Sequence, residues 1–204
     1  MLSPQINEAT VRLLTRHGVE VVNAVGAGCC GALGHHMGRA NDSHAQAAAN
    51  IRVWTQEIDG EGLDAIVINA SGCGTTVKDY GFMFRNDAAL KDDAARISAM
   101  ALDITEFIDT LDLSFTPQPH APTIAYHSAC SMQHGQKITA LPKQLLQKAG
   151  FEVRDVPEAH LCCGSAGTYK ILQPDLADQL RQRKIDNIAK TGADVVAAGN
   201  IGCI

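Results

Sequence analysis

An internal duplication decides how this chain can be organised. The tripeptide Cys-Cys-Gly occurs at residues 29–31 and again at 162–164, and each copy follows a Gly-x-Glu-Val sequence. Further along, Gly72-Cys73 matches Gly202-Cys203. The paired landmarks keep one order and lie about 130 residues apart, so we infer a duplicated unit of about that length.

Each unit alternates between amphipathic stretches and short apolar runs rich in β-branched residues. The periodicity predicts helices over residues 7–17, 42–58, 87–109, 138–149 and 175–190. The apolar runs predict buried strands over residues 19–25, 65–70, 123–126, 151–156 and 194–198. Apolar strands separated by helices indicate an α/β fold of two pseudo-symmetric repeats, with parallel sheets flanked by helices.

The duplication also predicts where the repeats begin and end. We expect a first repeat at residues 1–111 and a second at 123–204, joined by a proline-containing linker at 112–122. The second repeat opens with a strand and Cys130, whose counterparts in the first repeat would fall before residue 1. We therefore expect a fragment of a longer polypeptide, with the N-terminal strand missing from the first repeat and the second truncated after Cys203.

Composition narrows the class of protein. The 204 residues are 46% hydrophobic and carry a net charge of −5, which argues against nucleic acid as a partner. The sequence has neither a long apolar run for a membrane span nor a secretory signal, which favours the cytoplasm. Seven cysteines with two adjacent pairs do not suit a secreted disulfide framework, whereas clustered cysteines in a cytosolic protein bind metal or react.

The cysteines of the second repeat are the strongest candidate ligands. Each follows a predicted strand by a few residues, and loops after the carboxyl ends of parallel strands gather at one edge of a sheet. Four converging thiolates suit a soft metal, either zinc or an iron–sulfur cluster. The alternative of inert buried thiols is weak because the motif occurs twice. The predicted ligands are Cys130, Cys162, Cys163 and Cys203.

The first repeat offers three cysteines, Cys29, Cys30 and Cys73. They could hold a metal if water, His35 or His36 supplied a fourth donor, and an occupied site and a vestigial one remain equally open.

Two further signals compete with this interpretation. Residues 26–31 match the dinucleotide-binding pattern G-x-G-x-x-G, but the acidic residue expected about 20 positions later is missing and the second copy lacks the first two glycines. Three histidines, His127, His134 and His160, flank the cysteines of the second repeat. Any of them could bind metal or donate to a sulfur, but we expect each to be a surface residue or a neighbour of the ligands.

The second copy carries a family resemblance in three segments, at residues 126–130, 161–169 and 199–204. They resemble the cysteine-rich CCG domain, in which a cysteine, a Cys-Cys-Gly and a C-terminal cysteine follow one another at these spacings. Within that family, Gly26-Ala27-Gly28-Cys29-Cys30-Gly31-Ala32-Leu33 and the ending Asn200-Ile201-Gly202-Cys203 most resemble the C-terminal part of glycolate oxidase (glycolate dehydrogenase) iron–sulfur subunits.

The resemblance implies a subunit of an oxidoreductase. Cys130, Cys162, Cys163 and Cys203 would hold an iron–sulfur cluster, of the 4Fe–4S type. Electrons would come from flavin-containing subunits that oxidise glycolate and would pass to a membrane acceptor such as quinone, which implies a cytoplasmic or peripheral inner-membrane location. Two alternatives stay open: a zinc-stabilised docking domain without redox activity, and thiol chemistry like that of heterodisulfide reductases.

Overall fold

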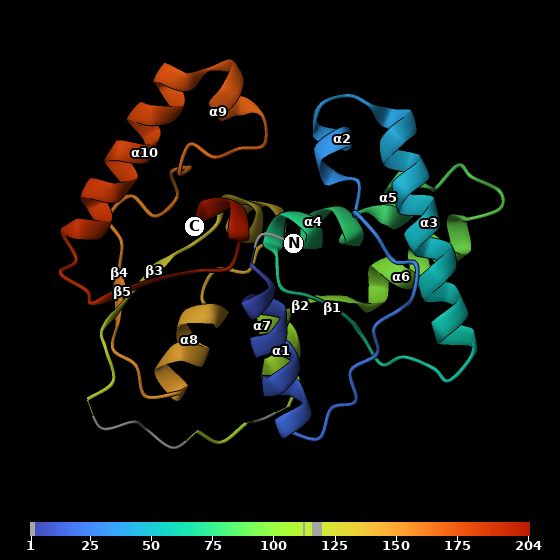
Figure 1. The fold of residues 1–204 in the computed structure, drawn as a ribbon, viewed down its shortest axis with the longest axis horizontal. Coiled ribbons are helices and arrows are strands. Elements are labelled where there is room, and N and C mark those ends of the chain that lie inside the picture. The colour runs from blue at the N-terminus through green and yellow to red at the C-terminus, as the bar shows by residue number, and fades with distance from the viewer. Residues whose placement is uncertain (1–2, 112, 116–119) are drawn as a thin grey trace. The chain divides into compact units, whose positions relative to one another are not determined.

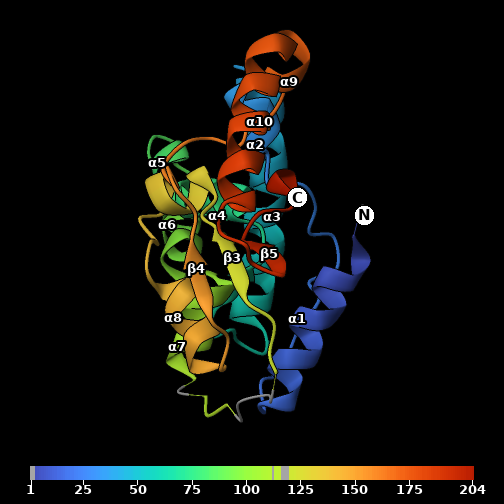
Figure 2. The same ribbon diagram turned by 90° about the vertical axis from the view of Figure 1, so that its left-hand side faces the viewer.

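The computed structural model describes residues 3–111, 113–115 and 120–204, which form two compact units. The first, here called unit 1, comprises the residues up to 69 together with 76–104. The second, unit 2, comprises residues 70–75 together with 105–204. Figure 1 labels the elements of both units, and Figure 2 shows them turned by 90°.

Unit 1 consists mainly of helices, with one short parallel sheet. Strands β1 (Ile66–Ile68) and β2 (Ala101–Asp103) pair with Ile66 opposite Ala101. Tyr80, Ile51 and Ile97 are fully buried in the core of this unit. The helices are α1 (Pro4–Arg16), α2 (Ala32–His36), α3 (Ala40–Asp59), α5 (Tyr80–Met83), α6 (Lys91–Met100) and, shared with unit 2 at its start, α4 (Ser71–Lys78).

Unit 2 is built around a three-stranded parallel sheet in the order β4-β3-β5. Its strands are β3 (Ile124–His127), β4 (Val153–Asp155) and β5 (Val195–Ala198). Tyr126 and Met132 anchor a core against which Leu146 of α8 packs. The helical elements are α7 (Ile104–Thr110), the π-helix η1 (Ser131–Gly135), α8 (Leu141–Lys148), α9 (Tyr169–Leu172), α10 (Pro174–Ala189) and the 3-10 helix η2 (Ile201–Cys203).

The α/β class and the parallel sheets predicted from the sequence are confirmed. The predicted helices at 7–17, 42–58, 138–149 and 175–190 correspond to α1, α3, α8 and α10. The predicted linker at 112–122 lies partly outside the described residues, and the repeat boundary stays a prediction.

The predicted buried strand at residues 19–25 is wrong. This segment has neither helix nor strand, and Val25 is 90% exposed. β-branched residues favour an extended backbone, but a strand also needs a neighbour to complete its hydrogen bonds. In unit 1 the two described strands, β1 and β2, pair with each other instead.

The single long helix predicted at residues 87–109 is also wrong. Helix α6 ends at Met100, and the extended backbone of Ala101 starts β2, after which α7 begins. The sequence does not indicate that the helix ends here, because Ala101 and Leu102 favour helices and neither glycine nor proline marks the break. Pairing with β1 overrides this local preference.

Each Cys-Cys-Gly glycine allows its loop to contact the backbone of a long helix. Gly31 has φ +84°, and a Cβ on it would lie 2.9 Å from the carbonyl oxygen of Ser43 in α3. Gly164 has φ +86°, and a Cβ there would lie 2.3 Å from the carbonyl oxygen of Ala177 in α10. Only glycine fits both the left-handed backbone and the contact, so the two repeats share this turn.

Seven positions beyond each of these contacts, the same long helix presents a buried polar side chain to the loop. Asn50 of α3, 1% exposed, donates to the carbonyl of Cys29 at 3.1 Å and accepts from the amide of Gly28 at 2.7 Å. Lys184 of α10, 4% exposed, donates to the carbonyls of Glu158 at 3.1 Å and Ala159 at 3.5 Å. The two repeats therefore share a loop anchor that is neutral in one unit and cationic in the other.

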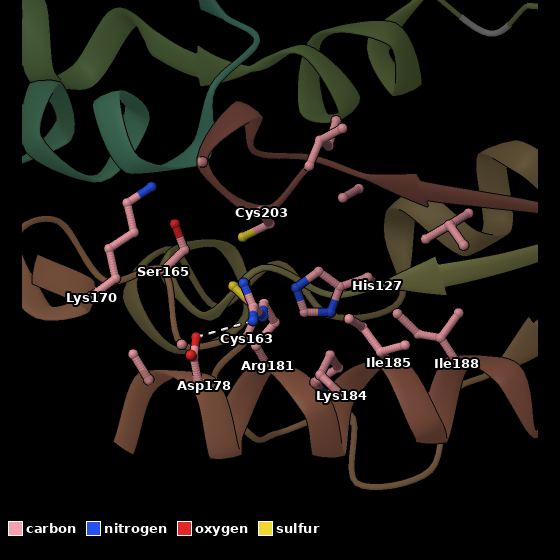
Figure 3. Close-up of a pocket in the computed structure, with 16 residues that line it drawn as sticks. His127, Cys163, Ser165, Lys170, Asp178, Arg181, Lys184, Ile185, Ile188 and Cys203 are labelled. Atoms are coloured by element: carbon pink, nitrogen blue, oxygen red, sulfur yellow. Dashed lines mark ion pairs between the residues drawn. The ribbon is translucent and has the colours of Figure 1, made fainter. Parts of the chain in front are cut away.

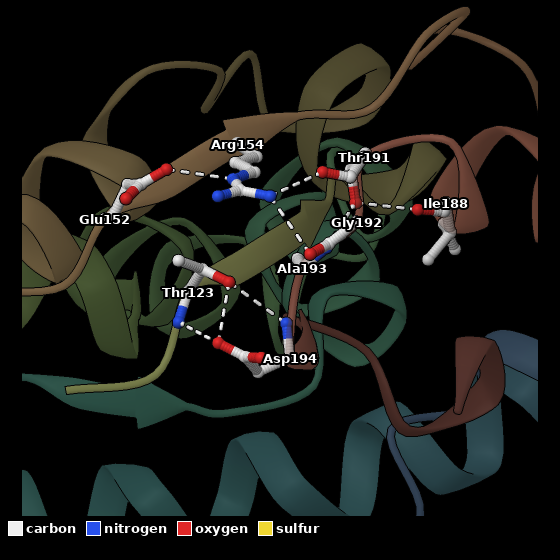
Figure 4. A network of polar contacts seen from close by, with 8 residues as sticks. All are labelled: Thr123, Glu152, Arg154, Ile188, Thr191, Gly192, Ala193 and Asp194. Carbon is white, nitrogen blue, oxygen red and sulfur yellow. Dashed lines mark hydrogen bonds and ion pairs between the residues drawn. The ribbon is translucent and has the colours of Figure 1, made fainter. Parts of the chain in front are cut away.

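The amino ends of the unit 2 strands are joined by a reciprocal contact between Thr123 and Asp194 (Figure 4). The Asp194 carboxylate accepts from the amide of Thr123 at 2.9 Å and from its hydroxyl at 2.8 Å. In return, the amide of Asp194 donates to the Thr123 hydroxyl at 3.0 Å. These bonds, the one from the Thr123 amide foremost, lower the pKa of Asp194 below its usual value.

Substituting Gly164 with alanine should destabilise the chain by about 3 kcal/mol or more, because left-handed strain adds to a backbone clash. Gly192→Ala is the matched control, since Gly192 has φ +60° but its added Cβ would meet only the end of the Arg154 side chain, at 3.4 Å. The control should cost about 1 kcal/mol. Urea unfolding measures both, and equal losses would contradict the role assigned to the helix contact.

The Thr123–Asp194 contact should make stability depend on pH. Because the folded-state pKa of Asp194 is lowered, its contribution is present above the unfolded-state pKa of about 3.9 and is lost as pH falls through the folded-state value. Asp194→Asn should lower the melting temperature at pH 7, and the difference from the parent chain should shrink towards pH 3. A difference that stays constant with pH would contradict this assignment.

Candidate functional site

The four cysteines of the second repeat lie beyond the carboxyl ends of the strands of unit 2. Cys130 follows β3 and precedes η1, while Cys203 ends η2, after β5. Cys162 and Cys163 lie in the loop between β4 and α9. In a parallel sheet the loops after the carboxyl ends of the strands lie at one edge, and all four cysteines lie at this edge.

The structure places these side chains next to one another, and Figure 3 shows two of them, Cys163 and Cys203, beside His127. The potential ligand atoms of His127, Cys163 and Cys203 all lie within 4.8 Å of one another. The thiol of Cys130 interacts with those of Cys162 and Cys163. The four cysteines predicted as ligands are therefore neighbours, together with one histidine that we did not expect among the ligands. Whether they bind a metal stays a prediction.

The thiols strongly shift one another's pKa values. The thiol of Cys203 donates to Cys163, and this hydrogen bond, with help from His127, lowers the pKa of Cys163 to about 3. The same bond raises the pKa of Cys203. Burial, and then the negative charge of Cys162, raise the pKa of Cys130. The four thiols could not all be ionised at once without a cation to offset the repulsion between the thiolates.

Several donors are directed at the sulfur atoms. The amide of Gly164 donates to Sγ of Cys162 at 3.3 Å, and Nδ2 of Asn200 donates to Sγ of Cys203 at 3.7 Å. The amide of Ser165 bonds Cys163. Amide donors of this kind stabilise negative sulfur and tune the potential of a bound cluster.

Lys184 adds a buried positive charge to the same region. Burial lowers the pKa of its ammonium group, while the neighbouring charges of Cys163, Cys162 and Cys203 act in the opposite direction. Lys184 was not among the residues predicted from the sequence, although its offset of about 130 residues from Asn50 could have indicated it.

A cavity of about 580 Å³ lies beside the cysteines (Figure 3). Its wall includes His127, Cys163 and Cys203, and helix α10 contributes Lys184 and Ile188. Val196 of β5 adds an apolar surface. A small molecule could therefore reach the sulfur atoms from this side.

His127 itself is 4% exposed, and its ring lies beside the thiol of Cys163, whose pKa a hydrogen bond from His127 helps to lower. One histidine nitrogen and several cysteine sulfurs form a donor set that suits zinc, iron and iron–sulfur clusters. The residues therefore fit a soft metal centre.

The other two flanking histidines meet the expectation from the sequence. His134 and His160 are exposed, and Nε2 of His134 lies 3.1 Å from the carbonyl oxygen of His160.

The cysteines of the first repeat are distributed over both units. Cys29 and Cys30 lie in unit 1, the former exposed and the latter buried, and the Cys30 carbonyl accepts from the hydroxyl of Tyr80 at 2.9 Å. Cys73 is half-buried in α4 and belongs to unit 2. A metal site made from these three residues, with or without His35 or His36, stays a prediction.

Within the described part of the chain, no helix combines the length and apolar character that crossing a bilayer requires.

The chain was compared with known proteins. The sequence pattern of the cysteine-rich CCG domain matches residues 1–78 and 124–204. Over 99% of its length the chain is 41% identical to the glycolate oxidase iron-sulfur subunit of Escherichia coli (strain K12), and the match covers 49% of that protein. It is 29% identical to the probable glycolate oxidase iron-sulfur subunit of Bacillus subtilis (strain 168), over 97% of the chain and 44% of that protein.

A third relative is covered more fully. The chain is 28% identical to lactate utilization protein A of Bacillus licheniformis, over 100% of the chain and 84% of that protein. By contrast, it spans about half the length of the two glycolate oxidase subunits. The two matched segments, each with its own Cys-Cys-Gly turn, agree with the duplication. The chain therefore belongs to the cysteine-rich CCG domain family.

Proposed function

We propose that this chain is an iron–sulfur electron-transfer module of a flavin-linked 2-hydroxyacid dehydrogenase. Its cluster, of the 4Fe–4S type, is held at the carboxyl edge of the unit 2 sheet by Cys130, Cys162, Cys163 and Cys203. The observation that carries the proposal is that these four thiols, from three loops, are neighbours: Cys130 interacts with Cys162 and Cys163, and Cys163 is hydrogen-bonded to Cys203. The names of two relatives as glycolate oxidase iron-sulfur subunits support it.

The proposed substrate of the whole enzyme is glycolate, which a flavin-containing partner subunit oxidises to glyoxylate. The two electrons released travel one at a time through the iron–sulfur subunit to a quinone-type acceptor in the membrane, and the two protons are released at the flavin. The module therefore works in the cytoplasm or attached peripherally to the inner membrane. Because the third relative is named a lactate utilization protein, the proposed substrate class includes other 2-hydroxyacids besides glycolate.

In this role a bound cluster supplies a site that accepts and returns one electron. The four cysteines hold it, and the amides of Gly164 and Ser165, with Asn200, donate to their sulfur atoms. The glycine turn fixes the Cys162-Cys163 loop on α10, which keeps these donors in place. No bond in the substrate is made or broken here.

One observation favours a second candidate, thiol chemistry like that of heterodisulfide reductases. The lowered pKa of Cys163 makes it a thiolate at neutral pH, and a thiolate is the form that attacks disulfides. The cavity beside it could admit a small disulfide. This candidate predicts disulfide reduction that alkylation of Cys163 abolishes.

Anaerobic purification of the chain should yield iron and acid-labile sulfide in nearly equal amounts, with visible absorbance and an EPR signal on reduction. Cys162→Ser and Cys163→Ser should each lose most of the iron, because each removes a ligand. Cys29→Ser, an exposed cysteine of unit 1, is the matched control and should leave the spectrum of the unit 2 cluster unchanged. Zinc alone, or a folded chain without metal, would contradict the proposal.

The charge on Lys184 should raise the reduction potential, because a nearby cation favours the more negative, reduced cluster. Lys184→Met removes that charge, so the midpoint potential should fall in a redox titration followed by EPR. Lys184→Met should also destabilise the fold by about 1–3 kcal/mol, since the Glu158 and Ala159 carbonyls lose their donor. Lys184→Arg keeps the charge and should leave the potential close to that of the parent chain; a fall in both variants would contradict the electrostatic role.

A further inference from the structure

We propose that the cavity beside the unit 2 cysteines binds an uncharged quinone, with its ring oxygens towards the charged end of the cavity and its apolar body along α10 and β5. This inference deepens the proposed function and rests on it, because it names the place where the electron acceptor meets the centre. The binding site itself is formed by residues of this chain.

The cavity lies where sheets of this topology bind ligands. Along the chain β3 comes first, β4 second and β5 third, but in the sheet β3 lies between the other two. Ligands of such sheets bind in the crevice outside the carboxyl ends of the first and third strands. His127 ends β3 and Ala198 ends β5; the two residues are opposite one another, and both line the cavity. Its volume of about 580 Å³ is sufficient for a small organic molecule.

The lining is charged at one end and apolar at the other. Figure 3 shows Lys170, Asp178 and Arg181 towards one side of the cavity, and Ile185 and Ile188 of α10 towards the other. The cavity therefore suits a molecule that has hydrogen-bonding atoms at one end and an apolar body.

The distribution of charge favours an uncharged ligand. The Arg181 guanidinium pairs with the Asp178 carboxylate at 3.1 Å, and the buried ammonium group of Lys184 interacts with the negative charge of Cys163. A centre held by four thiolates carries negative charge close to the cavity, which would repel an anion. The hydroxyl of Ser165 and the ammonium group of Lys170, also in the lining, can donate hydrogen bonds to the carbonyl oxygen of an uncharged quinone.

Apolar surface in the cavity is open to water. Ile185 is 50% exposed and Val196 is 52% exposed, although both belong to the cavity lining. Covering apolar side chains is favourable, and neighbouring exposed ones mark binding sites. A quinone would cover these side chains, whereas a small disulfide with charged ends, such as glutathione disulfide, would leave much of this surface uncovered.

The path for electrons from the proposed centre would be short, because two of its proposed ligands, Cys163 and Cys203, are themselves part of the cavity lining. Two successive one-electron transfers from the reduced iron–sulfur centre, which the flavin subunit reduces again each time, would convert the bound quinone to the quinol. The two protons that the quinol gains would come from water at the open side of the cavity.

The test is equilibrium dialysis of the full chain, purified anaerobically, against 2,3-dimethyl-1,4-naphthoquinone, whose substituted ring cannot add thiols. We expect one quinone to bind per chain. Ile185→Glu places a carboxylate in the apolar lining and should weaken binding by about tenfold or more. Leu176→Glu is the matched control, because Leu176 is also 50% exposed on α10 but does not line the cavity, and its affinity should equal that of the parent chain.

A second readout is the oxidation of the dithionite-reduced chain by the same quinone. Its rate should fall in Ile185→Glu and not in Leu176→Glu, with equal iron contents in both variants. Absence of quinone binding, or equal affinities of the two variants, would overturn this inference while the iron and sulfide analysis still supported the proposed function. Reduction of glutathione disulfide without reduction of the quinone would also overturn it.

Absence of iron and sulfide would overturn the proposed function instead. Dialysis of the folded, metal-free chain then decides whether the cavity binds quinone, because protein residues form it. Binding that Ile185→Glu weakens and Leu176→Glu does not would support the site, and absence of binding would refute it.

Discussion

The left-handed glycine of each Cys-Cys-Gly turn is the constraint on which the rest of the arrangement depends. At Gly164 the loop backbone lies so close to the Ala177 carbonyl that a methyl group could not fit, and at Gly31 the loop meets Ser43 in the same way. The turn holds two adjacent cysteines on the start of a long helix. Because that helix also anchors the loop carbonyls through a buried polar side chain, the sulfur positions follow from the backbone.

The two repeats use one architecture with different electrostatics. Asn50 in unit 1 satisfies its loop with a neutral amide, whereas Lys184 in unit 2 brings a positive charge to the side where the thiols converge. A buried ammonium group is costly to desolvate unless negative charge lies nearby. Its presence in unit 2 is therefore consistent with a site that carries several thiolates, and with the metal centre that we propose there.

The sequence was sufficient to predict the elements that depend on local pattern, and insufficient where a distant partner decides. The duplication, the α/β class and the gathering of the second-repeat cysteines follow from spacing and periodicity. The failures are β2, which is extended because β1 pairs with it, and residues 19–25, which lack such a partner. His127 was expected to be a surface residue or a neighbour of the ligands, because the pattern around Cys130 does not reveal that a ring nitrogen lies within 4.8 Å of the Cys163 and Cys203 sulfur atoms.

The cavity bears on how the centre would exchange electrons. Its lining combines apolar residues, among them Ile188 of α10 and Val196 of β5, with charged ones, among them Arg181 and Lys184. Because Lys184 is only 4% exposed, its charge acts on the centre with less screening than it would in water. A buried cation next to the proposed centre would make its reduced state easier to reach. A centre tuned in this way would suit the proposed role of accepting electrons from a flavin, because its potential could lie above that of the donor.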